Sequence, residues 1–217
     1  MNKKALIFQG GWEGHQPAEV AEILAGILNK ENYEVEVTDT LTTLENTNLK
    51  DYDLIIPNWT QGEITKEQLT PLMEAVEYGT GLAGLHGGMG DSFRWETDYQ
   101  FMIGGQWVAH PGNDLIEYKV NIVDMDHPLT VGMEDFTVVS EQYYMHVDPA
   151  VKVHATTKFP IAEGPYTSNG EVNMPVIWTK KWGKGKIYYN SLGHVASIVR
   201  MSNVSRLMRK GMIWATR

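Results

Sequence analysis

The sequence predicts an α/β fold with a mainly parallel sheet. Short continuous apolar runs, such as 5–8 and 54–56, are typical of strands that are buried on both faces. Segments with apolar residues at helical spacing separate these runs, and parallel strands need such crossover connections. The 217 residues contain no internal repeat, no low-complexity tract and no convincing domain boundary. We therefore predict one domain over residues 1–217.

The first part of the chain alternates strands with helices. A helix is expected after Pro17, which suits a first helical turn because its missing N–H would have no partner there. A second helix is expected over 65–78, where Thr65 and Gln68 are placed as a capping box. Ligands of such sheets bind at the carboxyl ends of the strands. The strands predicted in this part are 5–8, 33–38, 52–57 and 82–85.

The second part is richer in strands. The segment 104–111 is expected to be a loop because of its glycines, and the lysines around Gly183 and Gly185 predict a hairpin turn. The chain closes on an expected helix from Val195 to Trp214. Methionine and tryptophan on that helix could serve a homo-oligomer. The further strands predicted are 115–123, 138–139, 151–157, 176–179 and 186–189.

Composition excludes several classes of function. The chain has 18 Lys and Arg against 27 Asp and Glu, a net charge of -9, so binding to nucleic acid is not expected. Its apolar runs are far shorter than the roughly 18 residues of a membrane span or the 7 or more of a signal peptide. We expect a cytoplasmic protein with a small-molecule partner. The absence of cysteine removes disulfides, thiolate ligands and thiol nucleophiles.

Glycine and histidine occur together at three predicted strand ends, 10–15, 84–88 and 191–194. A parallel sheet would bring their imidazoles to one edge. Gly84-Leu85-His86-Gly87-Gly88 has the spacing of a nucleophile elbow, a turn that lifts its central side chain out at the top of a sheet. A fourth stretch, 104–111, adds another histidine.

The first of these stretches is also compared with a dinucleotide fingerprint. Gln9 stands where the first glycine is needed, and Glu13 would place negative charge beside a pyrophosphate. Glycines that serve a tight turn between strand and helix are therefore the better interpretation of this stretch.

The order and spacing of these motifs resemble the ThuA-like (trehalose-utilisation) family, relatives of the class I glutamine amidotransferases. The resemblance covers essentially the whole chain. It implies a three-layer, flavodoxin-like or amidotransferase-like fold with the elbow at the carboxyl edge of the sheet, and a link to carbohydrate metabolism. The motifs are Gly10–His15, Gly84–Gly88 with Asp91-Ser92-Phe93, Gly104–Pro111, Asp126-His127-Pro128, Glu141-Gln142-Tyr143 and Pro175–His194.

The resemblance also implies a change of chemistry at the elbow. Amidotransferases have a cysteine there, assisted by a late histidine and a carboxylate. In this chain His86 occupies the cysteine position and His194 resembles the late histidine. Because imidazole cannot replace the thiolate in forming a thioester, glutaminase activity is excluded.

We predict an enzyme of carbohydrate metabolism that acts on a sugar or keto-sugar. Histidine titrates near neutral pH, so two imidazoles can divide general-base and general-acid work. A carboxylate could orient one imidazole or act as the base itself. The predicted catalytic residues are His86, His110, Glu141 and His194, and the predicted substrate contacts are Gly11, Trp12, His15, Gly87 and Trp107.

Two alternatives remain open. A divalent metal such as zinc could assist the reaction, since three imidazoles and a water, or a carboxylate in place of one ligand, form catalytic zinc sites. Its ligands would come from His15, His86, His110 and His194, with Glu141 as a further candidate. The other alternative is a non-catalytic carbohydrate-binding or interaction protein, in which the flat rings of Trp12 and Trp107 would hold a sugar.

Overall fold

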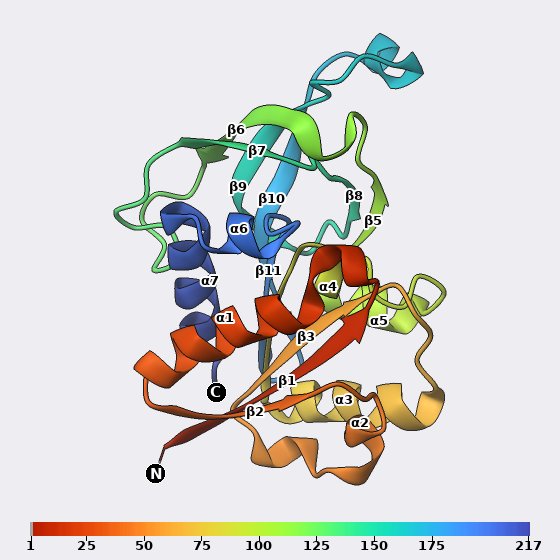
Figure 1. Cartoon of the computed structure of the whole chain (residues 1–217), viewed down its shortest axis with the longest axis vertical. Coiled ribbons are helices and arrows are strands. Elements are labelled where there is room, and N and C mark those ends of the chain that lie inside the picture. Colours follow the sequence, from red (N-terminus) through yellow and green to blue (C-terminus); the bar gives the residue numbers. More distant parts are fainter. Residues whose placement is uncertain (1) are drawn as a thin grey trace.

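A nine-stranded sheet with helices on both faces organises the chain (Figure 1). The computed structural model describes residues 2–217. The strand order is β2-β1-β3-β4-β11-β10-β9-β6-β7, so the predicted α/β fold is confirmed. The strands of the first five positions are β2 (Tyr33–Thr38), β1 (Lys3–Gly11), β3 (Leu54–Thr60), β4 (Gly81–Leu85) and β11 (Gly185–Asn190).

These five strands are parallel, and the rest of the sheet is antiparallel. The direction changes at the hairpin between β10 and β11, whose turn at Gly183 has a φ of 56°. Hairpins join neighbouring strands in opposite directions, so the parallel arrangement stops there. The antiparallel strands are β10 (Val172–Trp182), β9 (Lys152–Phe159), β6 (Ile116–Ile122) and β7 (Phe136–Ser140).

Two apolar cores cover the two faces of the sheet. The first core receives the apolar residues of α1 (Pro17–Lys30), α6 (Ala196–Val199) and α7 (Ser202–Ala215). The second core receives those of α2 (Thr43–Asn46), α3 (Lys66–Tyr78) and α5 (Thr97–Ile103). The predicted capping box is present at the start of α3, where Thr65 and Gln68 bond each other's backbone N–H. Short 3-10 turns complete the chain at Glu13–His15, Leu49–Asp51, Asn113–Leu115 and Pro165–Asn169.

Two local predictions are wrong. The segment predicted as a loop over 104–111 contains β5 (Gly105–Ala109), which pairs with β8 (Tyr144–Val147) in a separate two-stranded sheet. This partner is distant in sequence, so local glycine content could not reveal it. The predicted terminal helix is divided into α6 and α7, because Met201 adopts an extended ψ of 134° where the chain turns. Arg200, just before that turn, pairs with Glu19 of α1.

Within residues 2–217 no helix combines the length and the apolar character that crossing a bilayer requires.

Candidate functional site

The elbow predicted at His86 is built by the end of β4. This strand is fully buried, and α4 (His86–Gly90) begins directly after it. His86 has a φ of 43°, a positive value that is uncommon for a residue with a side chain. A Cβ at Gly84 would lie 2.5 Å from Cβ of Met89, and one at Gly88 would lie 2.5 Å from Oδ1 of Asn58. The flanking glycines are therefore required by close packing around the raised imidazole.

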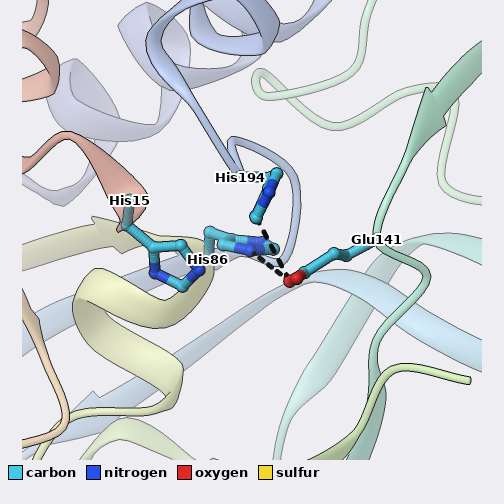
Figure 2. Close-up of side chains that lie close together, drawn as sticks. All are labelled: His15, His86, Glu141 and His194. Atoms are coloured by element: carbon cyan, nitrogen blue, oxygen red, sulfur yellow. Dashed lines mark hydrogen bonds and ion pairs between the residues drawn. The ribbon is translucent and has the colours of Figure 1, made fainter. Parts of the chain in front are cut away.

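Three imidazoles and one carboxylate meet above this elbow (Figure 2). His15 comes from the turn after β1, and His194 comes from the loop after β11. The ring centroid of His15 lies 4.8 Å from that of His86 and 5.1 Å from that of His194. Glu141, between β7 and β8, enters from the antiparallel part of the sheet. One ligand atom from each of the four residues lies within 4.8 Å of the others, and we call this set the four-residue cluster.

The carboxylate of Glu141 is the centre of these contacts. Its Oε2 lies 3.1 Å from Nε2 of His86 and 3.3 Å from Nδ1 of His194, while its Oε1 lies 3.7 Å from Nδ1 of His110. Burial alone would raise the pKa of Glu141, but a proton held between this carboxylate and the rings of His194 and His86 outweighs burial and keeps the pKa of Glu141 well below its usual range. Glu141 is therefore ionised at neutral pH.

The tautomer of His86 is decided by its other ring nitrogen. Nδ1 lies 2.8 Å from the carbonyl oxygen of Ser191, and because a carbonyl only accepts, Nδ1 carries the hydrogen. Burial lowers the pKa of His86 and favours the neutral ring. Without a proton on Nε2, a neutral His86 would direct the lone pair of Nε2 at the ionised Glu141. Two acceptors at 3.1 Å need a shared proton or a cation between them.

His15 is neutral as well. Burial lowers the pKa of His15 to about 3, and the neighbouring rings of His86 and His194 add to the shift. Its Nδ1 lies 2.8 Å from the hydroxyl of Thr60 at the end of β3. Among residues 2–217, Nδ1 of His194 has no aligned hydrogen-bond partner, although it is buried. The cluster thus offers buried imidazole nitrogens beside an ionised carboxylate.

Exposure differs between these histidines. His86 is 1% exposed, whereas the side chains of His194 and His110 are 13% and 30% exposed. His86 and Glu141 are therefore the most buried groups of the site, and the side chains of His194 and His110 are the more accessible ones. His110, which follows β5, is outside the four-residue cluster but also reaches Glu141.

The residues predicted to contact a substrate lie around the same cluster. Trp12 is 47% exposed and sets its ring edge against His15, with centroids 4.7 Å apart. A Cβ at Gly87 would lie 2.5 Å from Cε1 of His15, so this glycine lets the imidazole pack on the elbow. Gly11 ends β1 beside Thr60 with a φ of 80°. Trp107 lies 5.5 Å from His110 between ring centroids.

Comparison with known proteins gives the family. A family model described as trehalose utilisation, ThuA, matches residues 4–215. The chain belongs to the ThuA family. Its predicted resemblance is thereby confirmed. No match is found among curated proteins.

Solved structures share the fold of this ThuA-family chain. A ThuA-like protein from Parabacteroides merdae ATCC 43184 has a TM-score of 0.77 at 17% identity, covering 99% of this chain and 90% of that one. Another from Bacteroides uniformis ATCC 8492 has a TM-score of 0.78 at 19% identity, covering 98% and 91%. A β-galactosidase from Bacillus circulans sp. alkalophilus has a TM-score of 0.61 at 13% identity, covering 99% of this chain and 30% of the enzyme. At these identities the likeness shows the fold alone.

The ThuA-family site also contains residues that the sequence reasoning missed. Tyr143 stacks on His86 with ring centroids 4.0 Å apart and an interplanar angle of 26°. Tyr143 belongs to the Glu141-Gln142-Tyr143 motif, so the motif was a signal for it. Thr60 and Asn58 lie at the end of β3, where the strand-end rule could have found them. Arg94, whose guanidinium lies over the ring of Trp107 at 4.4 Å, carried no local signal.

Proposed function

We propose that this chain is an enzyme of carbohydrate metabolism that acts on a sugar or keto-sugar, with the four-residue cluster as its catalytic centre. The observation that carries the proposal is the contact between Nε2 of His86 and the carboxylate of Glu141. An ionised carboxylate beside a neutral imidazole lone pair is costly in a buried place unless the arrangement serves a proton or a cation.

The exposure of the histidines supports a division of roles. The side chains of His194 and His110 are the more accessible ones, so their imidazoles can give a proton to a sugar oxygen or take one from it. Glu141 contacts both rings and stabilises whichever one becomes charged. His86 holds the carboxylate, and its hydrogen bond to the Ser191 carbonyl keeps its ring in place.

The donor set also fits a divalent metal. Burial lowers the pKa values of His15 and His86 and so favours the neutral rings that a metal needs, while Glu141 presents an ionised carboxylate. His194 adds a buried Nδ1 without an aligned hydrogen-bond partner. The bond from Nδ1 of His86 to a backbone carbonyl is the usual support of a metal-binding imidazole. We propose that these four residues hold an ion such as zinc, which would polarise a sugar carbonyl or a bound water.

The substrate class rests on two supports. The family description refers to trehalose utilisation. The exposed ring of Trp12 stands beside His15 at the edge of the cluster, and flat aromatic faces suit sugar rings. A keto-sugar suits the site particularly. A carbonyl group makes the proton on the neighbouring carbon more acidic, so that an imidazole base can remove it.

Product analysis by NMR tests the proposal. The wild-type protein, purified without a histidine tag and analysed for metal, is incubated with trehalose and with a keto-disaccharide. We expect conversion by the wild type and by His146→Ala, which alters an exposed histidine outside the cluster, and none by Glu141→Gln. Equal conversion by Glu141→Gln would refute the assignment of the site.

A non-catalytic carbohydrate-binding protein is the second candidate. Its support is the exposed Trp12, together with the β-galactosidase in which the matched fold forms only part of a larger chain. Saturable binding of a disaccharide, with no product after long incubation in the presence or absence of zinc, would favour this candidate over the enzyme.

A further inference from the structure

Arg94 is held rigidly beside the candidate site. It follows His86 on the same stretch of chain, just beyond α4. Its Nε donates to Oδ1 of Asp91 at 2.6 Å, and its Nη2 donates to Oδ2 at 2.8 Å. The Asp91 carboxylate is 5% exposed, and the carbonyl of Arg94 accepts a bond of 2.7 Å from Gln100. The guanidinium also lies over the ring of Trp107 at 4.4 Å.

This arrangement leaves one edge of the guanidinium free. Arginine has five N–H donors in a planar fork, and Asp91 takes the edge formed by Nε and Nη2. The other edge presents parallel N–H groups of Nη1 and Nη2. Such a fork matches two oxygens that lie side by side. Because the side chain is 38% exposed, the free edge can reach a ligand.

A chain of contacts connects this edge with the four-residue cluster. The ring of Trp107 lies 5.5 Å from that of His110, and Nδ1 of His110 lies 3.7 Å from Glu141. The Asp91 carboxyl is close enough to His86 and His110 for both rings to affect its pKa, which burial raises overall. Arg94 is thus connected to Glu141 through Trp107 and His110, and a sugar that contacts His110 and extends past Trp107 would reach Arg94.

We propose that Arg94 determines the specificity of the site by binding two neighbouring hydroxyl groups of an uncharged sugar with its free edge. This inference rests on the proposed function. Asp91 already neutralises the guanidinium, and the ionised Glu141, in contact with His110, disfavours a second carboxylate in the site. A neutral diol satisfies both N–H donors without adding charge. In this proposal the ring of Trp107 holds the Arg94 guanidinium that lies over it, so this face of the ring does not contact the sugar.

The test compares binding of two sugars by calorimetry. The probes are trehalose, which has vicinal hydroxyls and no charge, and glucuronate, which adds a carboxylate. The variant Asp91→Asn/Arg94→Met removes both charges together, so that no unpaired carboxylate stays buried. Arg94→Lys keeps the charge but lacks the planar fork. Arg209→Met is the matched control, because Arg209 forms an exposed ion pair with Glu31 on another part of the surface.

We expect the wild type and Arg209→Met to bind trehalose equally. Both Arg94 variants should bind it about tenfold more weakly or worse, as expected for the loss of hydrogen bonds from a charged donor. Melting temperatures check that each variant is folded. Unchanged trehalose affinity in the Arg94 variants would overturn the inference alone. Tighter binding of glucuronate that depends on Arg94 would overturn its preference for a diol. If the wild type binds neither sugar, the proposed function fails as well.

Discussion

Two groups of histidines with a carboxylate lie in different parts of this chain. One is the four-residue cluster. The other, which we call the His154 group, consists of Asp124, His127, His154 and Thr179. In the His154 group, Nδ1 of His154 lies 3.1 Å from Asp124, and Nε2 lies 2.8 Å from the Thr179 hydroxyl. In the four-residue cluster, the lone pair of His86 Nε2 faces a carboxylate.

The two groups differ in whether the imidazole nitrogens have complementary hydrogen-bond partners within the protein. A hydroxyl can donate to Nε2 of His154, so each of its ring nitrogens has a partner of the opposite kind. The ring of His127 lies against that of His154 at a tilt of 37°, with centroids 4.2 Å apart, and its Nδ1 accepts a hydrogen bond from the backbone N–H of Leu129. Both groups contain buried imidazoles with lowered pKa values. Burial and proximity to a carboxylate therefore do not by themselves mark a reactive histidine. What sets His86 apart is that its Nε2 faces a carboxylate, whereas Nε2 of His154 faces a hydroxyl that can donate.

The largest expected effect is on catalysis at the elbow. His86→Asn keeps a donor for the Ser191 carbonyl and tolerates the positive φ, but removes Nε2. We expect a loss of activity of about a thousandfold or more, in the range for residues that act as a unit in a catalytic site. Turnover of the disaccharide that the wild type converts in the NMR experiment measures it. His154→Gln should retain near wild-type turnover, and a comparable loss in that variant would erase the distinction between the two groups.

The next effect concerns stability. His154→Ala removes a fully buried ring and leaves Asp124 and Thr179 without it, so we expect the free energy of unfolding to fall by roughly 2–4 kcal/mol. His146→Ala, at an exposed position, should stay within about 0.5 kcal/mol of the wild type. Urea denaturation gives both values. A stable His154→Ala protein would mean that the His154 group is not structural.

Metal binding should distinguish the two groups directly. At a zinc concentration of about 100 times Kd, binding stabilises a folded protein by about 2.7 kcal/mol. For a chain of this size, that raises Tm by roughly 5–10 °C. We expect this increase in metal-free wild type and in His154→Gln, and its loss in Glu141→Gln. Thermal unfolding monitored by circular dichroism is the measurement. An equal increase in Glu141→Gln would place the metal elsewhere.

The effect that is smallest at neutral pH is the pH dependence of stability, which develops only as the pH falls below 6.5. Burial lowers the pKa of His154 to about 4, with its neighbour His127 adding to the shift, while an unfolded histidine titrates near 6.5. Between these values the unfolded chain binds a proton that the folded chain does not. The free energy of unfolding should therefore fall by about 1.4 kcal/mol per pH unit for this group as the pH is lowered from 6.5 toward 4.

Urea denaturation at several pH values tests this dependence. His154→Gln should show a shallower slope than the wild type by about one proton, while His146→Ala should keep the full slope. His15, whose pKa is lowered to about 3, contributes in the same direction and remains in both variants. Identical slopes in His154→Gln and the wild type would contradict the assignment of the titration to His154.

Much of this site was predictable from local sequence. Apolar runs and helical spacing predicted the parallel strands, and the Gly84–Gly88 spacing predicted the elbow. The expectation that His15, His86 and His194 meet needed only the rule that parallel strands end at one edge. These features follow from short-range patterns because a buried strand and a tight turn each constrain the residues that form them.

The tertiary structure alone decided what the site can do. The pairing of β5 with β8 and the entry of Glu141 depend on segments that are far apart in the chain, which no local periodicity encodes. The stacking of Tyr143 on His86 and of Arg94 on Trp107 has the same origin. The tautomer of His86 depends on a carbonyl 105 positions away. The sequence by itself determined which residue types reach the edge of the sheet. Only the packing of the folded chain decided which atoms face one another. Whether a group donates or accepts a hydrogen bond, and whether it is buried, depends on its neighbours in space and not on its place in the sequence.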